Sequence, residues 1–269
     1  MSSPAVENSF IVYSYVDAVS VPLTEFTAEG RFTVRDDLRQ PDGILAAPLG
    51  IMVLSGASVN VHIHAQGSPT GVDVQIFDPA TDVSELLFRS RVLRVGRSQV
   101  FTEVRIEDAA DERRVIGQGT TSFVVTGAAE PQHPAYGQPV EHGEHLAVAG
   151  ERPPLTEVYA GVPQAGGGFE VAANAAAVTA GGRLHSGSMQ VLAEAAAMEA
   201  VRRSTGATRL WTERLGTTIL SAGRYGPFGI NAEVMAVAEG SAGCRVEVTD
   251  RGAGDRLIAL LAVRLRVLG

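Results

Sequence analysis

Residues 182–201 read GRLHSGSMQVLAEAAAMEAV, and the fold expected for the chain depends on this stretch. Its second part, Met189 to Val201, is rich in Ala and other good helix formers, so it predicts a helix. The segment is apolar on nearly all sides, which is typical of a buried helix rather than a surface helix. Glu199 lies near the end of this helix and is expected to be exposed, whereas Glu194 is surrounded by apolar residues.

The position of Glu194 requires an explanation, because a carboxylate is rarely buried completely without a partner. One explanation is a structural ion pair with an Arg of a neighbouring strand. The other is a functional role, in which the carboxylate takes part in binding or catalysis. Composition and helical periodicity leave both explanations open.

A second stretch of the chain follows the same pattern as the first. Near the start, Gly30–Val34 leads through polar residues to Gly43–Ala46, and later Gly167–Val171 leads at similar spacing to Gly182–His185. An apolar segment follows each pair. Self-similarity of this kind indicates that one structural unit is repeated in the chain.

Strand-like runs follow the apolar segment in both halves and are separated by polar turns. The runs are Arg89–Val95, Gln99–Ile106 and Gly117–Val125 in the first half, and Asn231–Val237, Ala242–Val248 and Leu257–Val267 in the second. Each half therefore predicts an α+β unit, in which one helix covers a face of an antiparallel sheet. We expect domains at residues 1–127 and 156–269, joined by a linker at 128–155 that is rich in Pro, Gly, His and Glu.

Bulk properties exclude several classes of protein. The 269 residues carry a net charge of −8, which argues against a nucleic-acid surface, and the single cysteine excludes an internal disulfide. No apolar run approaches the ~20 residues that cross a bilayer. The first ten residues lack the pattern of a secretion signal. We therefore expect a cytoplasmic protein that binds neither nucleic acid nor membranes.

The segment His185-Ser186-Gly187, followed by six residues and Glu194, resembles the phenylacetate-pathway branch of hot-dog thioesterases. That family carries His-Gly-Gly, six residues and then Asp or Glu, so Ser186 departs from its pattern. The resemblance covers roughly residues 25–127 and 160–268. It implies two hot-dog domains in one chain, each an antiparallel sheet wrapped around a central helix, paired as a pseudo-dimer. It also places Thr212, on the following strand, near the attacking water.

Thioester hydrolysis needs an activated water or a carboxylate nucleophile, together with donors for the developing oxyanion. A helix N-terminus supplies free N–H groups. However, Ser186 and Glu194 are eight residues apart on one helix, which is about 12 Å. The two residues cannot act on one carbonyl, so by resemblance each site combines one helix with the N-terminus of the helix from the other half.

Aligning Gly43–Ala46 with Gly182–His185 places Ala47 opposite Ser186 and Ser55 opposite Glu194. Two unlike sites follow from this alignment. The first joins Glu194 and Thr212 to the Ala47 amide of the N-terminal helix. The second joins His185 and the amides of Ser186 and Gly187 to Ser55, and it has no base.

Four basic residues crowd one strand region of the first half, at Arg89, Arg91, Arg94 and Arg97. Arg recognises phosphates well, so the cluster is a candidate site for the phosphates of coenzyme A. A solvated strand face or a subunit contact explains it equally. His62 and His64 alternate on an expected strand, but without a third ligand they do not predict a metal site.

The sequence thus predicts an acyl-CoA thioester hydrolase. Glu194 would act as base or nucleophile, Thr212 would orient water and the Ala47 amide would polarise the carbonyl. No cofactor is expected, because coenzyme A enters as part of the substrate. The alternative is a hot-dog protein that binds an acyl-CoA or a lipid without turnover. Since related hot-dog proteins stack their pseudo-dimers, we also expect a homo-oligomer.

Overall fold

The architecture is dominated by one antiparallel sheet. The computed structural model describes residues 11–129, 135–141, 152–174, 177–179 and 182–268. Thirteen strands form the sheet, in the order β10-β11-β13-β14-β15-β12-β5-β8-β7-β6-β2-β1-β9, and β3 and β4 form a separate pair.

The first half of the chain supplies the elements from α2 to β9. They are α2 (Ile11–Tyr15), β1 (Val19–Pro22), β2 (Thr27–Thr33), a 3-10 turn η1 (Asp36–Leu38), β3 (Arg39–Gln40), β4 (Gly43–Ile44), α3 (Ala46–His64), β5 (Ala65–Ile76), β6 (Glu85–Val95), β7 (Gln99–Asp108), β8 (Val115–Ala128) and β9 (Val140–Glu141). Strand β9 lies within the expected linker and pairs with β1.

The second half supplies the elements from α4 to β15. They are α4 (Leu155–Val158), β10 (Gly161–Pro163), β11 (Phe169–Val171), α5 (Ser186–Thr205), β12 (Leu210–Ile219), β13 (Phe228–Ala238), β14 (Ser241–Asp250), a 3-10 turn η2 (Arg251–Ala253) and β15 (Arg256–Val267). The two halves meet where β12 pairs with β5.

The strands of the two halves follow the same order outward from this junction. The first half gives β5, β8, β7, β6, β2 and β1, and the second gives β12, β15, β14, β13, β11 and β10. Even the irregularities match, because β5 bulges between Pro69 and Gly71 and β12 between Thr212 and Arg214. These bulges make Pro69 the counterpart of Thr212.

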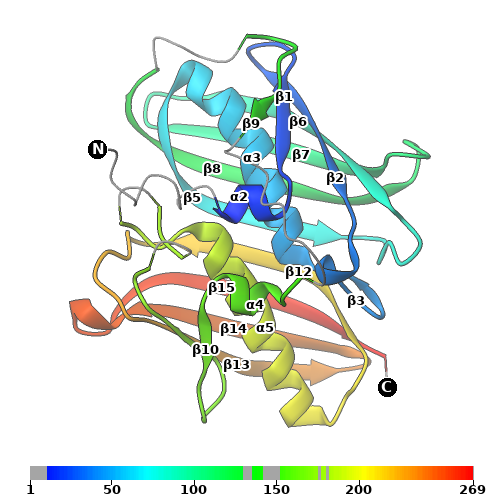
Figure 1. The fold of residues 1–269 in the computed structure, drawn as a ribbon, viewed down its shortest axis with the longest axis vertical. Helices are drawn as coiled ribbons and strands as arrows, with labels where there is room; N and C mark the ends of the chain where they lie inside the picture. The colour runs from blue at the N-terminus through cyan, green and yellow to red at the C-terminus, as the bar shows by residue number, and fades with distance from the viewer. Residues whose placement is uncertain (1–10, 130–134, 142–151, 175–176, 180–181, 269) are drawn as a thin grey trace.

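Each half packs one long helix against its own strands, as Figure 1 shows for α3 and α5. The two helices also contact each other. Fifteen residues of α3 are buried, and its composition would allow it to cross a membrane, although 83% of the apolar window lies inside the protein. The sequence-based statement that no apolar run approaches membrane-spanning length was therefore wrong. Burial on all sides explains why this core helix is so apolar.

The helix bounds correct a second expectation. His62 and His64 lie in the last turn of α3 rather than alternating on a strand. The periodicity of a short apolar run does not distinguish a buried helix from a buried strand. His64 bonds the carbonyl of Glu25 at 2.9 Å, and the part of the chain that the structure describes contains no cluster of metal-ligating side chains.

Close packing of α3 on β8 provides a test of the fold. A Cβ atom added at Gly119 would lie 2.5 Å from Cγ2 of Val53, a buried and conformationally stiff side chain of α3. We expect Gly119→Ala to lower the free energy of unfolding by about 1–3 kcal/mol, measured by urea denaturation.

The double variant Gly119→Ala/Val53→Ala should lose less stability than the sum of the two single variants, because the pair is in contact. Gly243→Ala is the matched control, since its Cβ atom would meet nothing within 4 Å. Additive effects at Gly119 and Val53 would contradict the close packing.

Candidate functional site

Glu194 extends from α5 to the beginning of α3, across the boundary between the two halves. Its Oε1 accepts hydrogen bonds from the Ala46 N–H at 2.8 Å and from the Thr212 hydroxyl, and its Oε2 accepts from the Ala47 N–H at 2.8 Å. The residue is 2% exposed. The partners are thus backbone amides and a hydroxyl, so the first of the two explanations left open by the sequence, an ion pair with an Arg, was wrong.

The start of α3 explains why a carboxylate is held there. The first N–H groups of a helix have no partner within the helix. The residue before the helix, Leu45, has no side-chain oxygen to accept from them, and Pro48 has no N–H to satisfy. Glu194 therefore caps α3 from a distance of 148 residues in sequence, and the positive end of the helix dipole favours its charge.

Burial and hydrogen bonding act on Glu194 in opposite directions. Desolvation raises the pKa of the carboxyl, whereas the bonds from Thr212, Ala46 and Ala47 lower it, and burial has the larger effect. The pKa of Glu194 consequently lies above the ordinary value for a glutamate. A raised pKa makes the ionised carboxylate a stronger base than an exposed one.

The two carboxylate oxygens are not equivalent. Each has roughly two lone-pair positions. Oε1 receives two hydrogen bonds from the described residues and is saturated, whereas Oε2 receives one. Oε2 is therefore the oxygen with capacity left for a water or a substrate.

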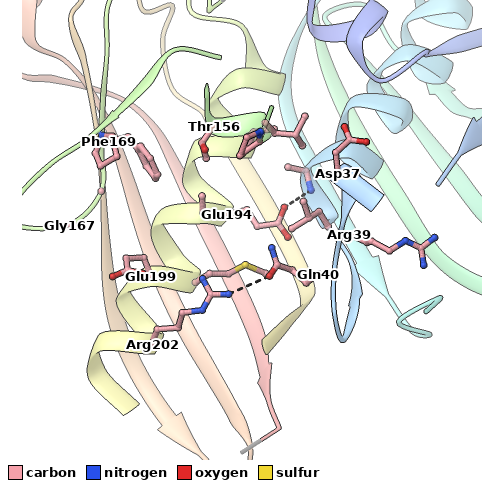
Figure 2. A pocket seen from close by; sticks show the side chains of 18 of the residues that line it. Asp37, Arg39, Gln40, Thr156, Gly167, Phe169, Glu194, Glu199 and Arg202 are labelled. Carbon is pink, nitrogen blue, oxygen red and sulfur yellow. Dashed lines mark hydrogen bonds between the residues drawn. The ribbon is translucent and has the colours of Figure 1, made fainter. Parts of the chain in front are cut away.

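Glu194 and Ala47 both line a cavity of about 710 Å³. Figure 2 shows Glu194 between residues from both halves, with Asp37 and Gln40 from the first half and Phe169 and Arg202 from the second. Much of the wall is apolar, formed by Leu45, Leu155, Phe169, Val191, Ala195 and Met198. A cavity of this size and lining suits a small organic ligand.

The charged residues of this cavity differ in their partners. Arg39 donates to three backbone carbonyls, and Asp37 is paired with Arg35. Arg202 donates to the neutral side chain of Gln40 at 3.3 Å. Arg203 lies 3.9 Å from Glu199. The C-terminal end of α5 thus presents two arginines that are only weakly neutralised.

No role was predicted from the sequence for Ala46, Arg202 or Arg203. The two arginines could have been identified from the sequence. They follow Glu194 by eight and nine residues on one helix, so their distance from it along the helix is fixed. The exposed position of Glu199, whose side chain is 51% exposed, was correctly predicted.

A second cavity, of about 690 Å³, lies at the beginning of α5. His185 and Ser186 line it, as do Leu54 and Pro69 from the first half. The Nδ1 atom of His185 accepts from the Gly187 N–H at 2.9 Å and caps α5. The structure therefore keeps His185, Ser186 and Gly187 together, and it places them away from Glu194.

The structure shifts the alignment of the two halves by one residue. Leu45 and His185 hold the same position and nearly the same backbone angles at the start of their helices. Leu54, rather than Ser55, is therefore the counterpart of Glu194, and Ala46, rather than Ala47, is the counterpart of Ser186. Ser55 faces the other way, with its hydroxyl 3.0 Å from that of Ser20.

The arginines of β6 and of the turn that follows it line neither cavity. Arg89 pairs with Glu29, Glu107 and Glu112, and Arg91 with Glu103, while Arg94 and Arg97 are exposed near the β6–β7 turn. None of the four lines a cavity that contains Glu194 or His185, and their contact with coenzyme A stays an untested prediction.

No family model matches the chain, and no curated protein matches it. Solved structures match over nearly the whole length. A tesB protein of Mycobacterium avium subspecies paratuberculosis is 11% identical, with 97% of this chain and 100% of that one covered and a TM-score of 0.63. The acyl-CoA thioesterase II TesB2 of Mycobacterium marinum is 11% identical, with coverages of 96% and 98% and a TM-score of 0.59.

A third solved structure is a protein of unknown function with a hot dog fold from Alicyclobacillus acidocaldarius. It is 12% identical, with 99% of each chain covered and a TM-score of 0.58. At such identities the similarity shows a shared fold and leaves function to the site itself. The chain therefore has a hot-dog fold, with a large antiparallel sheet and few helices.

The raised pKa of Glu194 makes stability depend on pH in a definite direction. Because the folded protein holds the proton more tightly than the unfolded chain, the stabilisation from this group is complete below the unfolded pKa and is lost as pH rises through the folded pKa. We expect Glu194→Gln to become less destabilising, relative to wild type, as pH rises across this range, measured by chemical denaturation at several pH values. A difference that does not vary with pH would contradict the raised pKa.

Proposed function

We propose that the chain is an acyl-CoA thioester hydrolase made of two tandem hot-dog units paired as a pseudo-dimer, with one active site at Glu194. One observation carries the proposal: a buried carboxylate is held between the halves, at the wall of a cavity large enough for an acyl group. The names of similar structures, which include acyl-CoA thioesterases, support the class of substrate.

The proposed reaction begins when the thioester carbonyl oxygen replaces Oε2 of Glu194 at the Ala47 N–H. Oε1 stays bonded to Ala46 and Thr212, so Thr212 positions the carboxylate. Oε2 then takes a proton from a water as that water attacks the carbonyl carbon. Collapse of the tetrahedral intermediate breaks the carbon–sulfur bond, and the departing thiolate takes the proton from Glu194. Direct attack by Oε2 on the carbonyl carbon is the nucleophilic form of the same chemistry.

Arg202 and Arg203 replace the β6 arginines as candidates for binding the phosphates of coenzyme A. They lie eight and nine residues after Glu194 on α5, at about 12 and 13.5 Å along the helix. The pantetheine arm has twelve bonds between its sulfur and its phosphate oxygen, as many as four extended residues, or about 14 Å. A thioester at Glu194 would therefore bring its diphosphate to the two arginines.

A non-catalytic acyl-CoA-binding protein is the second candidate. The observation in its favour is that Glu194 already caps α3 and accepts three hydrogen bonds, which would account for a purely structural carboxylate. The two candidates differ in whether thiol is released, so one assay separates them.

Assembly into homo-oligomers also remains a proposal. Exposed apolar side chains on the strands support it, among them Leu93, Phe101 and Met235, which are 49%, 37% and 59% exposed. Contiguous apolar surface of this kind is characteristic of interaction sites.

Replacement of the carboxylate tests the active site. We expect wild type to release thiol from at least one of a panel of short, aromatic and long acyl-CoAs, and Glu194→Gln to lower kcat by about 10² or more, because a positioned general base contributes that much. Glu199→Gln is the matched control, since it removes an exposed carboxylate from the same helix and the same cavity. Binding of acyl-CoA by wild type without turnover would overturn the hydrolase and support the binding protein.

The phosphate contact is tested by a pair of substrates with the same acyl group, one on coenzyme A and one on N-acetylcysteamine, which lacks phosphates. We expect Arg202→Ala/Arg203→Ala to raise KM for the coenzyme A ester about tenfold, as the loss of charge-assisted bonds predicts, and to leave kcat unchanged. KM for the N-acetylcysteamine ester should not change.

Arg94→Ala/Arg97→Ala removes the same charge outside the cavity and serves as the control. An equal rise in KM for both esters would show that the two α5 arginines do not contact the phosphates.

A further inference from the structure

The beginnings of α5 and α3 differ in how their first N–H groups are satisfied: His185 accepts from the Gly187 N–H, whereas Leu45 has no side-chain acceptor. Ser186 is the first residue of α5, is 8% exposed and lines the second cavity. Neither its N–H nor its hydroxyl bonds any residue that the structure describes. By contrast, the N–H of its counterpart, Ala46, donates to Glu194.

Two substitutions between the halves account for this difference. Where α5 carries Glu194, α3 carries Leu54, and where β12 carries Thr212, β5 carries Pro69. Both first-half residues line the second cavity. The second cavity is therefore similar in volume to the first but lacks the internal carboxylate that occupies the helix N-terminus there.

The charges around the two cavities also differ. Among the described residues, the lining of the second cavity contains Arg183, His62 and His185 and no Asp or Glu. The first cavity, by contrast, is lined by four acids, Asp36, Asp37, Glu194 and Glu199, together with four arginines, Arg39, Arg152, Arg202 and Arg203. In a chain of net charge −8, a cavity lined only by neutral and basic residues is a local exception.

Apolar residues form much of the remaining wall, namely Leu54, Phe123, Met189, Leu184, Ile219 and Leu220. A helix N-terminus with free donors is a site for anions. The polar end of this cavity thus fits an anionic group, and its walls fit a hydrocarbon chain.

We propose that the second cavity binds a free aliphatic carboxylate, with the carboxylate on the N–H and hydroxyl of Ser186 and the chain between the apolar residues of both halves. The internal precedent is Glu194, whose carboxylate occupies the equivalent place on α3 at 2.8 Å from two amides. Arg183 at the same cavity complements the charge. This inference is independent of whether Glu194 is catalytic.

The test is calorimetric titration of the full chain with octanoate, and with 1-octanol as the uncharged probe. We expect wild type to bind octanoate and to bind 1-octanol at least about tenfold more weakly, because the bonds to the charged group are lost. Leu54→Glu supplies a resident carboxylate and should weaken octanoate binding by about tenfold or more. Ser186→Ala removes one donor and should weaken it several-fold.

Glu194→Gln changes only the first cavity and should leave octanoate affinity as in wild type. Loss of binding in Glu194→Gln, with no change in Leu54→Glu and Ser186→Ala, would place the ligand in the first cavity and overturn the proposal. Equal affinity for octanoate and 1-octanol, or no octanoate binding at millimolar concentration, would also overturn it. If circular dichroism shows that Leu54→Glu does not fold, the proposal is tested by Ser186→Ala and by the comparison of octanoate with 1-octanol.

Discussion

The carboxylate of Glu194 on the first turn of α3 is the interaction on which the rest of the structure depends. It connects the central helix of one half to that of the other and satisfies the N–H groups of Ala46 and Ala47. A helix that begins after Leu45, with Pro48 in its first turn, has no local cap. The fold of the first half is therefore complete only when the second half is in place.

Holding this charge inside the protein is costly, and the geometry shows what offsets the cost. Transfer of a carboxylate into an apolar interior is strongly unfavourable unless its oxygens are hydrogen-bonded. Three donors reach Glu194, and bonds to an ionised acceptor are about twice as strong as neutral ones. The pKa nevertheless remains raised, because burial has the larger effect. The same balance that stabilises the fold leaves a carboxylate with a strong tendency to accept a proton.

The sequence was sufficient for the parts of this arrangement that depend on periodicity and length. An acid inside an apolar helix predicted a buried carboxylate, and the separation of about 12 Å between Ser186 and Glu194 required a partner from elsewhere. By resemblance Thr212 was expected to orient the attacking water; in the structure its hydroxyl donates to Oε1 of Glu194.

The alignment between the halves could not be fixed from the sequence, because few residues are identical and a shift of one residue leaves the apolar pattern intact. That shift placed Ser55, instead of Leu54, opposite Glu194. The surroundings of the arginines at and after the end of β6 could not be predicted for a related reason. Spacing along the chain reveals a basic cluster, but not that Glu29, Glu103, Glu107 and Glu112 neutralise part of it across neighbouring strands.

Joining two similar units in one chain has a consequence for their sites. In a symmetric homodimer the same residue occupies equivalent positions, so a change at one site is made at both. Within a single chain, Glu194 and Leu54 can differ, as can Thr212 and Pro69. The N-terminus of α3 then receives an internal carboxylate, whereas at the N-terminus of α5 only the Gly187 N–H is capped, by His185, and the donors of Ser186 are left. A single scaffold thereby provides two cavities of similar size that differ at the helix N-terminus: in the first cavity the carboxylate of Glu194 occupies it, and in the second the donors of Ser186 are left for an anion from solution.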